Sequence, residues 1–86
     1  MISAEYMFMP IRLYLQNEAT NKNRFYTIHV QPDLFGCYSV IREWGRLDNK
    51  GGKIRITPAL TEIEAHRVAE SAKEYRITRG YSDTYA

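Results

Sequence analysis

One segment of this chain carries both the start and the stop signals of a helix, and it lies near the C-terminal end. Thr61 is a favourable N-cap, and Glu64, three residues later, completes a capping box. Gly80 is a favourable residue for the position just beyond a helix. The side chains between these signals that share one helical face are small or apolar until the last turn, namely Ala65, Val68, Ala69, Ala72, Tyr75 and Arg76. The pattern predicts a helix that lies close against another layer.

Before this helix, the chain alternates apolar and polar residues in the way that is typical of half-buried strands. The predicted strands cover residues 11–16, 25–30, 37–44 and 53–57. We expect Gly45 to end or bulge the third strand and Pro58 to end the fourth. In the fourth strand, Ile54 and Ile56 are expected to point inward, with Lys53, Arg55 and Thr57 outward. The order predicts a small α+β domain, an antiparallel sheet of four to five strands with one α-helix packed on one face.

A chain of 86 residues is long enough for one hydrophobic core, so we expect a single domain over residues 10–81. Residues 1–9 are interpreted as an N-terminal tail or an extra strand, and residues 82–86 as a C-terminal tail. No apolar run reaches the length of a membrane span, and no signal peptide is recognised, so no membrane partner is expected. Cys37 is the one cysteine, which excludes an internal disulfide and suits a reducing cytoplasm.

The formal net charge of +2 is small, but the positive charge is concentrated in one segment. Between Arg42 and Arg55, five basic residues stand against two acidic ones. Basic residues on adjacent strands are typical of a surface that contacts phosphates, and they are equally compatible with a solvated hairpin. His29 and His66 have no third ligand at metal spacing, and no nucleophile–base pair emerges. We therefore predict no catalytic residues, no metal and no cofactor.

The segment Trp44-Gly45-Arg46 and its surroundings resemble the WGR domain, a family named for this tripeptide. The family occurs in DNA-damage-sensing poly(ADP-ribose) polymerases and in bacterial proteins, where it is sometimes free-standing. Asn23-Arg24-Phe25-Tyr26 is similar to the Asn-Lys-Phe-Tyr of the family's preceding strand, and Gly36-Cys37-Tyr38 leads into the next one. Together with Gly80-Tyr81 after the helix, these landmarks extend the resemblance over about residues 11–81. The chain is identified as a free-standing bacterial member.

The resemblance implies a non-catalytic domain that binds nucleic acid, DNA rather than RNA, at its backbone or strand ends. In the polymerases the family's Trp packs against the sugar of a terminal nucleotide, and its Arg links to nucleic acid or neighbouring domains. The resemblance assigns these roles to Trp44 and Arg46. Tyr81, at the helix end, is a further candidate for a terminal phosphate, although closing the core is an alternative role. The charge pattern adds phosphate contacts from Arg42, Lys53 and Arg55.

Two features leave alternatives open. Trp, Tyr and Arg are also enriched where proteins bind one another, so the same surface is compatible with docking a protein partner or a second copy. A Trp44 buried against the helix would bind neither. The chain also departs from the family just after the signature, where Asp48 and Gly51-Gly52 replace the usual Gly and Gly-Gln. Asp48 is expected to oppose close approach of a phosphate.

Overall fold

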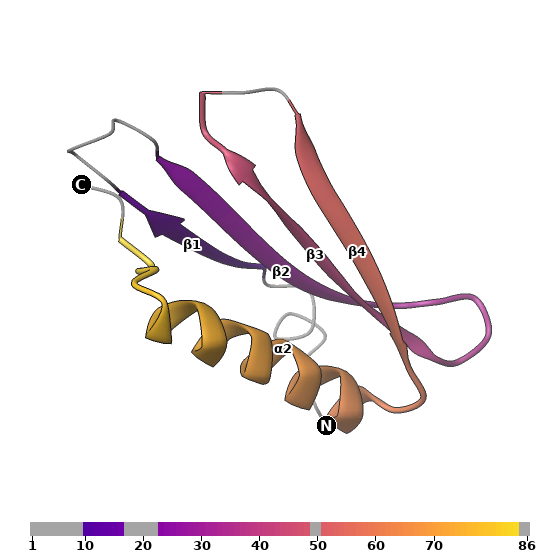
Figure 1. The fold of residues 1–86 in the computed structure, drawn as a ribbon. Helices are drawn as coiled ribbons and strands as arrows, with labels where there is room; N and C mark the ends of the chain where they lie inside the picture. The colour runs from indigo at the N-terminus through magenta and orange to yellow at the C-terminus, as the bar shows by residue number, and fades with distance from the viewer. Residues whose placement is uncertain (1–9, 17–22, 49–50, 85–86) are drawn as a thin grey trace.

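A computed structural model describes residues 10–16, 23–48 and 51–84 of the chain. Within these ranges, four strands form one antiparallel sheet in the order of the sequence, and one helix packs on one face of it (Figure 1). The elements are β1 (Ile11–Leu15), β2 (Arg24–Pro32), β3 (Tyr38–Arg46), β4 (Gly52–Ala59) and α2 (Glu62–Thr78). The predicted α+β class is confirmed.

Both ends of α2 have the predicted capping residues. The Thr61 side chain accepts a hydrogen bond from the backbone N–H of Glu64 at 3.1 Å. The Glu64 carboxylate in turn accepts the backbone N–H of Leu60, so one more exposed donor at the helix start is satisfied. At the other end Gly80 has φ +98°, and the N–H groups of Gly80 and Tyr81 donate to the carbonyls of Ile77 and Arg76. This pair of bonds defines a Schellman motif.

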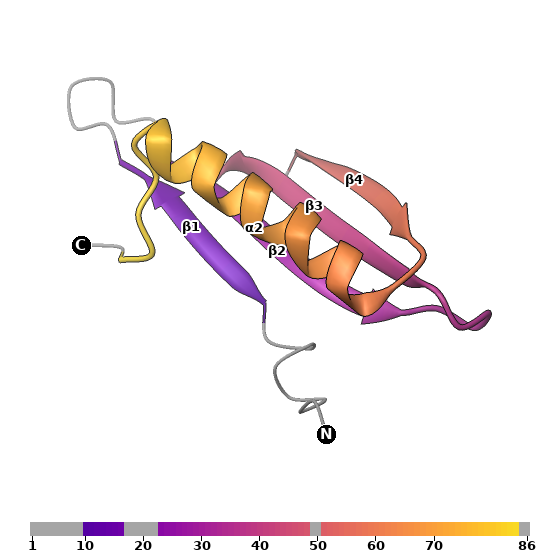
Figure 2. The same cartoon turned by 90° about the horizontal axis from the view of Figure 1, so that it is seen from below.

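The core lies between α2 and the face of the sheet that the helix covers. Its buried residues are Leu13, Tyr26, Ile28, Val30, Val40, Ala59, Ala65, Ala69 and Tyr81. Ala65 and Ala69 are the buried helix positions, and these small side chains let α2 lie close to β2. Figure 2 shows α2 running along the middle of the sheet, with β4 extending beyond its cover. The helix side of β3 and β4 therefore remains accessible toward the turn that joins them, whereas its other end is buried in the core.

The predicted facing of β4 is wrong. Lys53 is directly opposite Trp44 and Arg55 is opposite Arg42, and paired residues in an antiparallel sheet point to the same side. Lys53 and Arg55 therefore face the helix side, and Ile54 and Ile56 face the open side, where they are 60% and 59% exposed. Alternation reveals which residues share a face, but the pairing with β3 decides which face the helix covers.

The two predicted strand ends are also wrong. Gly45 lies inside β3, opposite Gly52, and β3 continues to Arg46 without a bulge between these residues. A Cβ on Gly45 would lie 3.2 Å from the carbonyl oxygen of Gly51, so glycine here allows close approach of the two strands. Pro58 lies inside β4, which runs to Ala59. An edge strand tolerates proline because one side of its backbone has no strand partner.

The chain after α2 returns to the sheet through a single antiparallel bridge between Ser82 and Tyr14. Their backbone groups exchange hydrogen bonds of 2.7 and 2.8 Å on the outer edge of β1. The predicted tail or strand at residues 1–9 lies outside the described residues. None of the described helices is long and apolar enough to cross a membrane.

Candidate nucleic-acid interface

The predicted site residues of β3 and β4 share one side of the sheet. Arg42, Trp44 and Arg46 alternate along β3, and all point to the side on which α2 packs. The β4 residues Lys53 and Arg55 lie opposite Trp44 and Arg42 on the same side. The structure thus places five of the six predicted residues on the face that the helix only partly covers, and the sixth, Tyr81, borders the same face from the segment after α2.

Two further arginines, which sequence reasoning did not include, complete this surface. Arg24 lies opposite Arg46 in the β2–β3 register, and Arg76 reaches toward the sheet from the last turn of α2. Signals for both existed in the sequence, since Arg24 alternates with Tyr26 and Arg76 falls on the helical stripe that faces the sheet. We call the six cations of this side the basic face: Arg24, Arg42, Arg46, Lys53, Arg55 and Arg76.

Aromatic rings pack against one another and against Arg76 within the basic face. Trp44 is half-buried, and its ring stacks on the buried Tyr26 with centroids 5.7 Å apart and planes inclined by 23°. Tyr81 meets the same Tyr26 ring edge-on at 6.3 Å. The Arg76 guanidinium lies 4.3 Å from the centroid of Tyr26, within cation–π distance. Trp44 is therefore held by the sheet with part of its ring accessible, and Arg76 is held over the rings.

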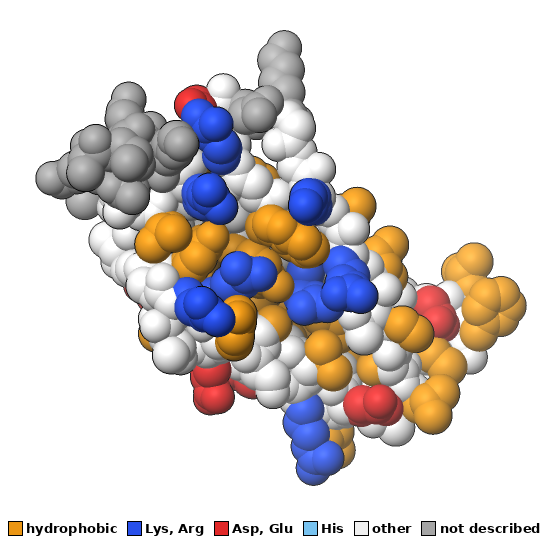
Figure 3. Space-filling model, in the orientation of Figure 1, with side chains coloured by type: hydrophobic (Ala, Val, Ile, Leu, Met, Phe, Trp, Pro, Cys, Tyr) orange, Lys and Arg blue, Asp and Glu red, His pale blue; other side chains and the backbone are white. Residues whose placement is uncertain are grey.

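A hollow of about 440 Å³ opens at the hairpin end of this face, and we call it the hairpin hollow. It is lined by Arg24, Trp44, Gly45, Arg46, Gly51, Gly52, Lys53, Arg76 and Tyr81. Four of these residues are cationic, and Trp44 and Tyr81 supply aromatic surface. Tyr81 is only 8% exposed, so it serves the core and contributes to the wall of the hollow. Figure 3 shows Lys and Arg side chains among hydrophobic ones across this side, with acidic side chains toward the margins.

The two acidic residues of the β3–β4 hairpin, Glu43 and Asp48, lie in different positions relative to the basic face. Glu43 lies between Arg42 and Trp44 in sequence but points to the opposite side of the sheet, because it pairs with Thr27 and Ile54. Asp48 lies just past β3, where its carboxylate accepts two hydrogen bonds from the Arg46 guanidinium, at 3.1 and 2.9 Å. Asp48 would therefore oppose an approaching phosphate by competing with it for the Arg46 guanidinium.

This competition is weak in energy. The side chains of Arg46 and Asp48 are 42% and 58% exposed, and exposed ion pairs contribute about 0–1 kcal/mol. A phosphate that approaches Arg46 can displace the carboxylate at small cost. The centre of the turn, residues 49 and 50, lies outside the described residues.

The histidines lie apart from the basic face. His29 is on the open side of β2, and His66 is near the start of α2, where its Nε2 is 3.8 Å from the Glu62 carboxylate. Among the described residues, no group of three His, Cys, Asp or Glu side chains is placed to hold a metal ion. Cys37 is partly buried in the β2–β3 turn. The chemistry that the site offers is cationic and aromatic.

Comparisons with known proteins agree with this arrangement. The family model of the WGR domain matches residues 9–86. An uncharacterised protein, y4dW, of Sinorhizobium fredii (strain NBRC 101917 / NGR234) is 39% identical over 74 residues, which cover 84% of this chain and 36% of the relative. The chain thus spans about a third of the length of this curated relative. No solved structure matches the sequence significantly.

Proposed function

The chain belongs to the WGR domain family, and we propose that it binds nucleic acid, DNA in preference to RNA, through the basic face. The observation that carries the proposal is the clustering of six cations around an aromatic centre, with Asp48 as the acid paired to one of them. Nucleic-acid binding by WGR domains of poly(ADP-ribose) polymerases supports it at the level of the family. DNA preference and strand-end recognition are carried over from that resemblance.

The proposed contacts follow from the chemistry of each side chain. The guanidinium groups of Arg24, Arg46 and Arg76 surround the hairpin hollow and suit bidentate contact with phosphate oxygens. Trp44 offers the accessible part of its ring to a sugar or a base, and stacking on a base contributes about 1–3 kcal/mol. Such contacts read the backbone and the end of a strand rather than its base sequence. The proposed role is binding without catalysis.

Fluorescence anisotropy of labelled DNA tests the proposal. A nicked duplex, a blunt duplex, a single strand and an RNA strand are compared at two salt concentrations. We expect salt-sensitive binding that is strongest for DNA with ends or nicks. Reversing two charges of the basic face, Lys53→Glu with Arg55→Glu, is expected to abolish it, since both side chains are exposed and repulsion replaces attraction.

Arg12→Glu provides the matched control for the single variant Lys53→Glu. Arg12 is an exposed strand residue on the open side of the sheet, so its reversal changes the net charge equally and leaves the basic face intact. Thermal unfolding of each variant checks the fold. Absence of binding to every probe at low salt would contradict the proposal. Equal loss of affinity in the Arg12 and Lys53 variants would contradict the assigned surface.

A further inference from the structure

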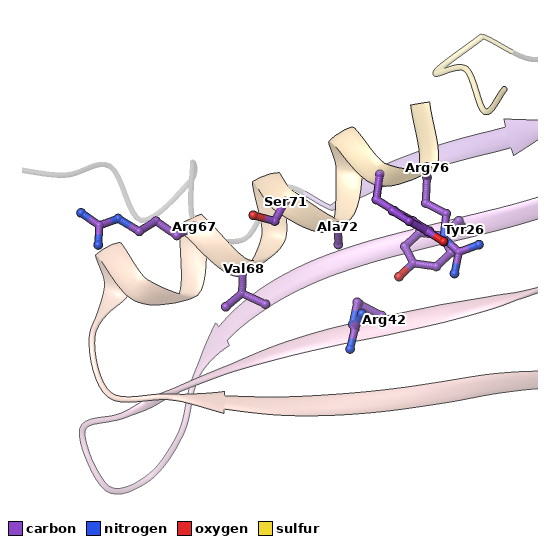
Figure 4. A pocket seen from close by; sticks show the side chains of 8 residues that line it. Tyr26, Arg42, Arg67, Val68, Ser71, Ala72 and Arg76 are labelled. Atoms are coloured by element: carbon purple, nitrogen blue, oxygen red, sulfur yellow. The ribbon is translucent and has the colours of Figure 1, made fainter. Parts of the chain in front are cut away.

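A second hollow, of about 510 Å³, lies between α2 and β3, next to the hairpin hollow. We call it the helix hollow, and Figure 4 shows the side chains that line it: Tyr26, Arg42, Arg67, Val68, Ser71, Ala72, Tyr75 and Arg76. Arg76 belongs to both hollows. The volume of the helix hollow falls in the range of small-molecule sites, about 300–1,000 Å³.

Arg42 on the sheet wall of this hollow has unused hydrogen-bonding capacity. Its Nε is buried and has no partner in the described part of the chain. Its terminal nitrogen makes one long hydrogen bond, 3.4 Å, to the hydroxyl of Thr57. A guanidinium presents donors in a planar fork that matches a phosphate or carboxylate, and leaving a buried donor unpaired costs free energy. Because the Nε itself is covered, the geometry favours an added acceptor at the terminal nitrogens of Arg42, beside this unpaired donor.

The surroundings of Arg42 specify a negatively charged acceptor. Arg55 lies directly opposite it on β4, and like charges at paired positions repel each other. Arg76 enters from the helix and lies over the Tyr26 ring, with Arg67 at the rim extending away from the hollow (Figure 4). None of the lining residues is acidic. An anion in the hollow would pair Arg42 and relieve this repulsion.

We propose that the helix hollow is a discrete binding site for a phosphate group, held between Arg42 of β3 and Arg76 of α2. The Ser71 hydroxyl and the ring of Tyr75 supply a polar contact and a flat apolar surface on the helix wall. Two sources carry this group, a free mononucleotide or the strand of nucleic acid bound at the hairpin hollow. Only the second source rests on the proposed function.

NMR of the 15N-labelled protein tests the site directly, because the Nε–Hε signal of Arg42 reports on the orphan donor itself. The probes are AMP, adenosine as the phosphate-free control, and a short single-stranded DNA. We expect AMP or the DNA to shift the Arg42 Nε–Hε and Ser71 amide signals with saturation. Adenosine at equal concentration should leave them in place. The Nε–Hε signal of Arg12, on the open side of the sheet, is the internal control.

The two sources give different outcomes. A saturable shift with AMP alone identifies a free nucleotide, and a shift that only the DNA produces identifies the bound strand. Arg42→Gln should lower the affinity for whichever probe shifts the signal by about tenfold or more, since a hydrogen bond to a charged group is lost. Arg42→Lys keeps the positive charge but loses the planar guanidinium, so its affinity should lie between those of the wild type and Arg42→Gln. An Arg42 signal that no probe moves, or that adenosine moves equally, overturns the inference even if DNA binds at the hairpin hollow.

Discussion

At the scale of single residues, Asp48 is the side chain that most directly limits the basic face. It makes two hydrogen bonds to Arg46, the residue that the family resemblance assigns to nucleic-acid contact. A phosphate must compete with this carboxylate, and it also meets the repulsion of a negative charge at the rim of the hairpin hollow. In the proposed binding mode, the contact of a phosphate with Arg46 is therefore expected to be weaker than it would be without Asp48.

Asp48→Asn is expected to raise the affinity for DNA up to about fivefold, because an exposed ion pair and a repulsive charge are removed together. Fluorescence anisotropy at low salt measures the change. Glu43→Gln also removes one negative charge, on β3 itself, but its side chain faces the open side of the sheet. It should raise the affinity much less. Equal gains in the two variants would indicate a general charge effect rather than release of Arg46.

At the scale of elements, the edge strand β4 has the least cover. Ile54 and Ile56 lie on the open side, whereas Ile28 of β2 is 1% exposed beneath α2. Replacing both exposed isoleucines by threonine keeps β-branched side chains on the strand and should lower the free energy of unfolding by no more than about 1 kcal/mol. Ile28→Ala should cost about 2–5 kcal/mol. Urea unfolding compares them, and a loss in the double variant as large as that of Ile28→Ala would show that the isoleucines face the core.

The same element shows how far local sequence signals reach. The capping of α2 by Thr61 and Gly80 and the existence of each strand follow from residues that are close in sequence, and those predictions are confirmed. The facing of β4 depends on its pairing with β3, which no local pattern encodes. Its isoleucines suggested burial, yet the pairing of Gly45 with Gly52 turns the cations to the helix side. The predicted strand end at Pro58 was wrong for a related reason, since a strand accommodates proline only where it lies at the edge of the sheet, as β4 does.

The sequence predicts the part of the candidate site whose residues lie along a single strand. Arg42, Trp44 and Arg46 share a face by alternation alone, and Lys53 and Arg55 share another alternation, so the sequence could group them. Arg76 is distant in sequence and joins them through the packing of α2 on Tyr26. The role of Asp48 as a partner of Arg46 likewise requires the geometry of the turn. The resemblance to the WGR family, carried by Trp44-Gly45-Arg46, is confirmed by the family match.

At the scale of the whole molecule, most of the cations on the described strands lie on one side of the sheet. The helix side carries the basic face, whereas Glu43 and Arg12 lie on the open side. A strand of nucleic acid bound on one side would therefore meet several cations at once and release their counterions together. Binding of this kind is dominated by phosphate neutralisation and depends steeply on salt.

This concentration of positive charge on one side predicts which variants change the salt dependence and which do not. Each duplex phosphate neutralised contributes about −0.9 to the slope of log K against log salt, so Lys53→Gln should make the slope shallower by about that amount. Arg12→Gln removes an equal charge from the opposite side and should shift neither slope nor affinity appreciably. Anisotropy titrations of a duplex at a series of salt concentrations give both slopes. Parallel lines for wild type and Lys53→Gln would exclude Lys53 from phosphate contact, because a lost contact must release fewer counterions whatever its effect on affinity.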